Sequence, residues 1–138
     1  SKASHSKGFG AFQIPFYYSL YFKQLIMLYP INTKPSKFGK CVMSVGISEV
    51  PAEVWERLLT RHLNGDWGDL DEDSSATNDR AFKEGKSHWI FSVYKNAYKG
   101  KDICIETNGY GLSKDVMDLI NFTVDDYNYT VIMFPSER

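Results

Sequence analysis

The sequence predicts a single α+β domain in which an antiparallel sheet of about four strands carries two or three helices on one face. The chain has 138 residues, which is enough for one hydrophobic core and short for two. Apolar residues recur with helical spacing in its middle, and short alternating runs follow toward the C-terminus. Helices followed by strands are typical of α+β domains, in which the helices gather on one face of an antiparallel sheet.

The clearest predicted helix lies within SEVPAEVWERLLTRHLNG, residues 48–65. Pro51 suits the first turn, and Asn64-Gly65 ends the helix. A shorter helix is expected over residues 75–84, capped by Ser74 or Ser75 and ended by Gly85. A third, capped by Ser113, is expected over residues 113–121. One apolar stripe at i, i+3, i+4, i+7 and i+8 defines the first helix: Trp55, Leu58, Leu59, His62 and Leu63.

Four runs of alternating apolar residues predict the strands of the sheet, at residues 40–45, 88–95, 101–107 and 129–134. The sequence NAYKG, residues 96–100, is typical of a hairpin loop, so the second and third strands should pair antiparallel.

The N-terminal part of the chain is unusually aromatic. Residues 9–31, FGAFQIPFYYSLYFKQLIMLYPI, contain one charge, Lys23. Pro15, Lys23 and the lack of a small-x-small cleavage site oppose a signal peptide or a membrane span. After Pro15 the spacing predicts a helix that is apolar on most sides, which is either buried or docked on a partner or a second copy. The chain is therefore divided into an N-terminal extension, 1–37, and a main domain, 38–138.

Composition narrows the classes of function. The net charge is −1 and the predicted pI is about 6.3, so a nucleic-acid backbone is a less favoured partner than a protein. Cys41 and Cys104 belong to no CxxC pair, which argues against structural zinc. Two buried thiols in a reducing cytoplasm are favoured over a disulfide between them. No cofactor is expected, and the location is expected to be cytoplasmic.

The segment NGDWGDLDED, residues 64–73, is the most distinctive in the chain. The favoured interpretation is structural: Asp66 and Asp69 form turns, and Trp67 folds over the helix end and buries its ring. The alternative is a binding site centred on an exposed Trp67 or on the acids. Asp66, Trp67 and Asp69 are therefore the candidate binding residues of this segment.

The same segment raises the question of a metal ion. Asp69, Asp71 and Asp73 could supply the oxygen ligands that hard cations prefer. Their spacing lacks the pattern of a calcium-binding loop, so no metal is predicted.

A catalytic hypothesis pairs His62 with His88, supported by Arg61 or the nearby acids, in acid/base cleavage of RNA. His62 lies on the apolar stripe, where a packed histidine is common. The sequence contains no nucleophile elbow, phosphate-binding loop or HExxH motif. The hypothesis therefore ranks below a non-catalytic role.

The predicted hairpin carries aromatic and basic residues together. Tyr94 and Tyr98 could stack on bases, and Lys95, Lys99 and Lys101 could meet phosphates, as in single-strand binding sites. The alternative is a solvated hairpin tip.

Several segments together resemble a family of small bacterial proteins with a GDWGDL motif, found on plasmids and integrated elements and without established biochemistry. The segments are RHLNGDWGDLDED, NDRAFKEG, FSVY, ICIET and VIMFPSER. The resemblance covers residues 38–138 and departs at 1–37 and at an insertion over 108–128. It implies one α+β domain and a mobile-element setting, and it names no reaction and no catalytic residue.

These observations predict a non-catalytic, protein-binding accessory factor of a plasmid, phage or integrated element. The N-terminal extension and the 108–128 insertion are expected to form the contact surface, including self-association through the extension. The alternatives are a toxin-like ribonuclease and a single-strand nucleic-acid binding module. No membrane association is expected.

Overall fold

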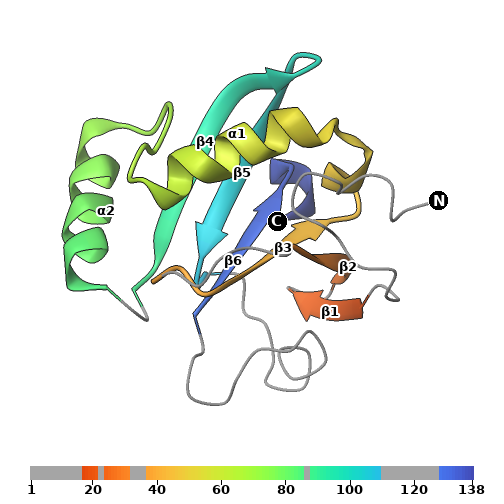
Figure 1. Cartoon of the computed structure of the whole chain (residues 1–138), viewed down its shortest axis with the longest axis horizontal. Coiled ribbons are helices and arrows are strands. Elements are labelled where there is room, and N and C mark those ends of the chain that lie inside the picture. The colour runs from red at the N-terminus through yellow and green to blue at the C-terminus, as the bar shows by residue number, and fades with distance from the viewer. Residues whose placement is uncertain (1–16, 22–23, 32–36, 86–87, 110–127) are drawn as a thin grey trace.

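The computed structural model describes residues 17–21, 24–31, 37–85, 88–109 and 128–138. One sheet has the strand order β1-β2-β3-β6-β5-β4, and two helices accompany it (Figure 1). The α+β class predicted from the sequence is confirmed. The elements are β1 (Tyr17–Tyr21), β2 (Gln24–Ile31), β3 (Lys40–Ser44), η2 (Ile47–Glu49), α1 (Ala52–Leu63), α2 (Glu72–Glu84), β4 (Ile90–Tyr98), β5 (Lys101–Thr107), β6 (Tyr129–Met133) and η3 (Pro135–Glu137).

The sheet is mixed rather than antiparallel throughout. All neighbouring strands are antiparallel except β3 and β6, which run parallel with Cys41 opposite Thr130 and Met43 opposite Ile132. The prediction of a wholly antiparallel sheet is therefore wrong at this pair. Alternation along a strand indicates which residues share a face, but it carries no information about the direction of a distant neighbour.

The helix expected after Pro15 is also wrong, because the described part of that region forms β1 and β2. Leu28 is fully buried, and Tyr29 and Ile31, which point to the other face of β2, are 9% and 3% exposed. A strand covered on both faces is apolar on all sides, which is the pattern that suggested a buried helix. Since β2 pairs with β3, residues 24–31 belong to the sheet of the main domain and not to a separate extension.

Helix α1 crosses one face of the sheet, and its apolar stripe forms the core there (Figure 1). Trp55 and Leu59 are fully buried against strand residues such as Ile105 and Ile132. Each such side chain contributes roughly 1.5–3 kcal/mol relative to an exposed position. The helix ends as predicted, with the Asn64 side-chain amide donating to the carbonyl of Thr60.

Helix α2 lies beside β4 and begins earlier than predicted (Figure 1). Its N-cap is Asp71 rather than Ser74 or Ser75, because the Asp71 carboxylate accepts from the backbone N–H of Ser74 at 2.8 Å and from its hydroxyl at 2.9 Å. Gly85 ends the helix with a φ of 95°, as the sequence predicts.

The β4–β5 hairpin is tighter than the predicted five-residue loop. Its turn consists of Lys99 and Gly100, which both have positive φ, 48° and 75°. Positive φ at both central residues is characteristic of the type I′ turn, whose twist matches that of paired strands. The helix predicted over residues 113–121 lies outside the described residues.

Among the described residues, one carboxylate is buried on the face of the sheet opposite α1. Glu106 is 1% exposed, and its oxygens accept from the indole N–H of Trp89 at 2.7 Å and from the Arg138 guanidinium at 2.8 and 2.9 Å. The charge is therefore paired and fully hydrogen-bonded, as burial requires. Through this pair, η3 and the end of the sequence are held against β5.

Both cysteines are buried free thiols. Cys41 belongs to the core under α1, and Cys104 alternates onto the opposite face of β5. No described helix is long and apolar enough to span a bilayer.

Candidate functional site

The GDWGDL segment closes the outer edge of β4. Gly68 and Val93 form a parallel bridge, in which the Val93 N–H donates to the Trp67 carbonyl at 3.3 Å and the Asp69 N–H donates to the Val93 carbonyl at 2.7 Å. The Asp69 carboxylate accepts from the N–H of Lys95 at 2.8 Å. One loop thus satisfies both outward backbone groups of Val93 and the N–H of Lys95 in an edge strand.

Helix α2 covers the edge of β4 two residues earlier, at Phe91. The Asn78 side chain donates to the carbonyl of Phe91 at 2.6 Å and accepts from its N–H at 3.3 Å. An edge strand with unpaired backbone groups is a template for association with other chains, and proteins commonly cover it. Asp69 of the GDWGDL segment and Asn78 of the NDRAFKEG segment therefore stabilise the fold by covering β4.

Trp67 is 5% exposed, so its ring is buried, as the structural interpretation of this segment predicts. Its indole N–H donates to the Asp79 carboxylate at 2.8 Å. Its ring meets His62 and Phe82 edge-on, with centroids 5.6 Å apart in each case. Trp67 joins α1, the loop and α2, so the predicted structural role is confirmed and little of the ring is left for a ligand.

Asp66 and Arg61 form a bidentate ion pair at the start of the segment, with Nε–Oδ2 at 2.7 Å and Nη2–Oδ1 at 3.2 Å. This hydrogen bonding raises the pKa of Arg61 and lowers that of Asp66. The Tyr94 hydroxyl donates to the Asp66 carbonyl at 2.7 Å. Tyr94 is 2% exposed and burial raises its pKa to about 12, so its ring is not available for stacking on a base.

His62 is fully buried at the centre of a chain of hydrogen bonds. Its Nδ1 lies 2.5 Å from the hydroxyl of Ser92, and its Nε2 lies 2.9 Å from that of Thr107. The Thr107 hydroxyl lies 2.8 Å from the hydroxyl of Thr130, which donates to the carbonyl of Phe38 at 2.9 Å. Burial lowers the pKa of His62 to about 3, so the ring is neutral near pH 7.

The order of these bonds determines the tautomer of His62. A carbonyl only accepts, so the single hydroxyl proton of Thr130 is used on Phe38. Thr107 must then donate to Thr130 and accept from His62, which places the ring proton on Nε2. Nδ1 accepts from Ser92. Each hydroxyl and imidazole proton in this series of hydrogen bonds is therefore donated to another residue of the core.

The structure does not bring the proposed catalytic residues together. His88 lies at the other end of α2, where its Nε2 is 2.6 Å from the carboxylate of Glu84 and its Nδ1 is 3.2 Å from the Gly85 carbonyl. His62 is enclosed among hydroxyls on the helix side of the sheet. The hydrogen-bonding groups described here for the two rings belong to different residues.

The candidate metal ligands are separated as well. Asp69 is bonded to β4 and Asp71 caps α2, which lowers the pKa of Asp71. Asp73 follows in the first turn of that helix. Within the described ranges, no three His, Cys, Asp or Glu side chains are grouped to hold an ion.

The remaining candidate, Tyr98, lies in a pocket at the closed end of the β4–β5 hairpin, with a volume of about 380 Å³. We call this the hairpin-end pocket. Three separate segments form it, namely the connection from β3 to α1, the hairpin and the C-terminal turn. The lining residues are Gly46, Glu49, Val50, Tyr98, Lys99, Lys101, Phe134, Ser136 and Glu137.

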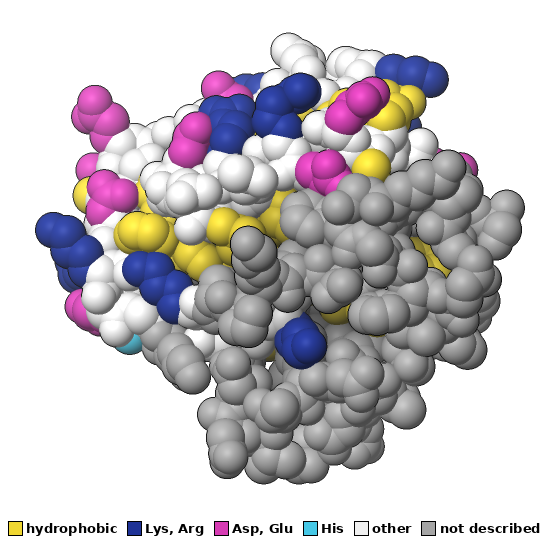
Figure 2. All heavy atoms as spheres, viewed as in Figure 1, with side chains coloured by type: hydrophobic (Ala, Val, Ile, Leu, Met, Phe, Trp, Pro, Cys, Tyr) yellow, Lys and Arg dark blue, Asp and Glu magenta, His cyan; other side chains and the backbone are white. Residues whose placement is uncertain are grey.

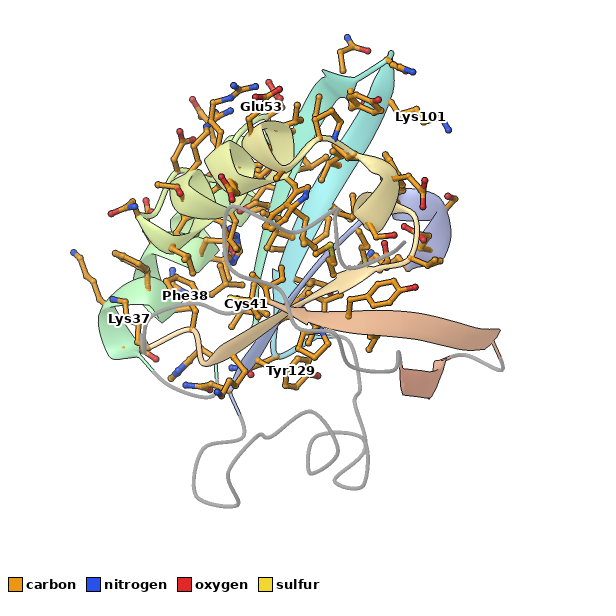
Figure 3. All side chains as sticks on the ribbon, turned by 45° about the vertical axis from the view of Figure 1, so that its right-hand side comes forward. Lys37, Phe38, Cys41, Glu53, Lys101 and Tyr129 are labelled. Carbon is orange, nitrogen blue, oxygen red and sulfur yellow. The ribbon has the colours of Figure 1, made fainter. Side chains whose placement is uncertain are left out.

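Aromatic and cationic side chains are adjacent in this pocket. The Lys99 ammonium lies 5.3 Å from the centroid of the Tyr98 ring, and the Lys101 ammonium lies 5.4 Å from that of Phe134. The Lys101 side chain extends away from the hairpin in Figure 3. Basic, apolar and acidic side chains lie side by side at this end of the molecule in Figure 2.

The sequence located only part of this pocket. Tyr98, Lys99 and Lys101 are local to one hairpin, and their composition identified them. Val50, Phe134 and Ser136 were missed, because nothing in their own segments indicates that they meet the hairpin.

No protein-family model, curated protein or solved structure matches this chain. The resemblance carried by the GDWGDL segment stays a prediction.

Proposed function

We propose that this protein is a non-catalytic binding protein that holds a partner protein at the hairpin-end pocket. The observation that carries the proposal is the pocket itself, where two lysines border rings and apolar surface. Concave sites with an apolar lining and a few polar groups are the usual form of binding sites. Aromatic residues are enriched where proteins meet.

The state of His62 favours binding over acid/base catalysis. A general acid or base needs a pKa near the working pH and must reach the reacting group. His62 has no exposed surface, and its pKa is about 3. The ribonuclease alternative thus loses the residue on which it depends.

Single-strand nucleic-acid binding is the second candidate, and the geometry supports it less. A stacking site uses successive exposed rings along a basic groove. Tyr94 is buried, which leaves only the partly exposed Tyr98 among the tyrosines of this hairpin. The GDWGDL resemblance supports a partner encoded by a mobile element or by its bacterial host.

Site-specific cross-linking tests the proposal. A photoreactive amino acid at Ser136, on the pocket wall, should cross-link the partner in cells. The same group at Thr77, on the exposed side of α2, should not. The Lys99→Glu, Lys101→Glu double variant should abolish the Ser136 product, whereas Lys83→Glu on α2 should keep it. A partner captured equally from Thr77, or unaffected by the double variant, would contradict the proposal.

A further inference from the structure

The hairpin-end pocket also indicates the chemistry of its occupant, an inference that rests on the proposed function. We infer that the pocket takes an acidic side chain of a partner protein together with a neighbouring apolar side chain. The volume of about 380 Å³ lies near the small end of the roughly 300–1,000 Å³ of ligand pockets. It suits one or two side chains rather than a large cofactor.

The two lysines supply the recognition of charge. Lys99 and Lys101 are exposed, and no carboxylate of the described residues lies within ion-pair distance of either ammonium. Each ammonium lies beside a ring that excludes water from one side. A carboxylate that reaches either ammonium forms charge-assisted hydrogen bonds, which are the stronger class.

The acidic residues of the lining limit how much negative charge can enter. Glu137 is bound to neutral donors, namely the Ser44 hydroxyl at 2.5 Å and the N–H groups of Phe134 and Gly46, both at 3.0 Å. Glu49 adds a second acid to the lining. A strand of phosphates would bring several charges past both acids, whereas one carboxylate can contact the lysines alone. The charges therefore favour an acidic side chain over a nucleic acid.

The apolar part of the lining accounts for the second side chain. Val50 is 2% exposed and forms part of the wall, and the rings of Tyr98 and Phe134 are partly exposed. Apolar area removed from water gives roughly 25 cal/mol per Å². An aromatic residue next to the acid would cover these rings.

A defined peptide probes this chemistry. The full chain, labelled with ¹⁵N, would be titrated with a capped peptide that contains adjacent phenylalanine and glutamate, while amide signals are followed by NMR. Saturable shifts are expected at Gly46, Gly100 and Lys101. Changing the peptide glutamate to glutamine, or Lys101→Gln in the protein, should weaken binding about tenfold, the loss expected for one charge-assisted hydrogen bond. Lys83→Gln should leave the affinity unchanged.

The outcomes separate this inference from the proposed function. Binding at the pocket that needs both the glutamate and the lysines supports the inference. Equal binding of the glutamine peptide, or no binding while Ser136 still cross-links a partner lost in the lysine double variant, overturns the inference and leaves the proposed function. Saturation of the same amides by oligothymidylate but not by the peptide overturns both.

Discussion

His62 shows how one residue can match a catalytic pattern and yet be part of the core. It lies on the apolar stripe of α1, and its two ring nitrogens connect the helix to β4 and β5 through hydroxyls. A buried polar group that is fully hydrogen-bonded fixes the packing around it, whereas an unpaired one is costly. The ring also meets Phe38 and Trp67, with centroids at 5.2 and 5.6 Å.

The lowered pKa of His62 predicts that the protein loses stability in mild acid. The folded-state pKa is about 3 and the ordinary value is 6.5, so between these values the unfolded chain binds a proton that the folded chain does not. Stability is therefore fully present above pH 6.5 and falls as the pH is lowered. From pH 6.5 to 4.5 the loss should be about 2 kcal/mol.

Urea unfolding at several pH values measures this loss. The window above pH 4.5 avoids most carboxylate titration. His62→Gln should flatten the dependence, while His88→Gln on the surface should keep it. NMR of the imidazole nitrogens in the wild-type protein provides a check that needs no variant, because the ring should stay neutral with its proton on Nε2 to pH 4.5. A ring that titrates near pH 6.5 in the folded protein would disprove the assignment.

At the scale of elements, the GDWGDL loop acts as a partial extra strand on β4. Its backbone bridge and the Asp69 carboxylate satisfy the outward groups of Val93 and the N–H of Lys95, and Asn78 of α2 satisfies those of Phe91. The close approach depends on Gly68, which has a φ of 71°. A Cβ at this position would lie 2.3 Å from the carbonyl oxygen of Val93.

Gly68→Ala should therefore destabilise the protein far more than Gly85→Ala. Both glycines have positive φ, so both variants carry backbone strain of roughly 1–3 kcal/mol. A Cβ at Gly85 meets nothing within 4 Å, whereas at Gly68 it meets backbone and the Tyr94 ring. The free energy of unfolding should fall by about 2 kcal/mol more in Gly68→Ala than in Gly85→Ala, in line with the cost of overpacking. Urea unfolding measures the stability of the two variants. Equal losses of stability would mean that the close approach of Gly68 to β4 is not maintained.

At the scale of the whole molecule, one sheet joins segments from both ends of the described chain. β3 lies between β2 and β6, and η3 follows β6 back toward the turn after β3, where Glu137 bonds to Ser44 and Gly46. This contact between η3 and the turn after β3 forms part of the hairpin-end pocket. Charges of both signs are mixed over the surface that Figure 2 shows around α1 and α2.

Burial of the two thiols predicts that neither reacts while the protein is folded. Cys41 is 2% exposed and Cys104 is fully buried, and burial raises the pKa of Cys104 to about 12. The reactive thiolate is then scarce as well as inaccessible. A disulfide-exchange reagent such as dithionitrobenzoate should label neither in buffer and both in denaturant. Cys41→Ser assigns the Cys104 signal, and fast labelling of that variant in buffer would indicate local opening of the sheet.

The sequence by itself determined the α+β class, both described helices and the four strands from β3 to β6, because each rests on a local period of apolar residues. Turn chemistry and an adjacent helix end favoured a structural role for Trp67, but the sequence left its burial open and the structure decided it. Only the tertiary structure decided that residues 17–21 and 24–31 form strands and that β3 and β6 are parallel. A strand buried on both faces and a buried helix have the same apolar composition, and strand direction depends on connections between distant segments. The hairpin-end pocket likewise required the fold, because three segments that are separate in sequence meet only when the sheet closes.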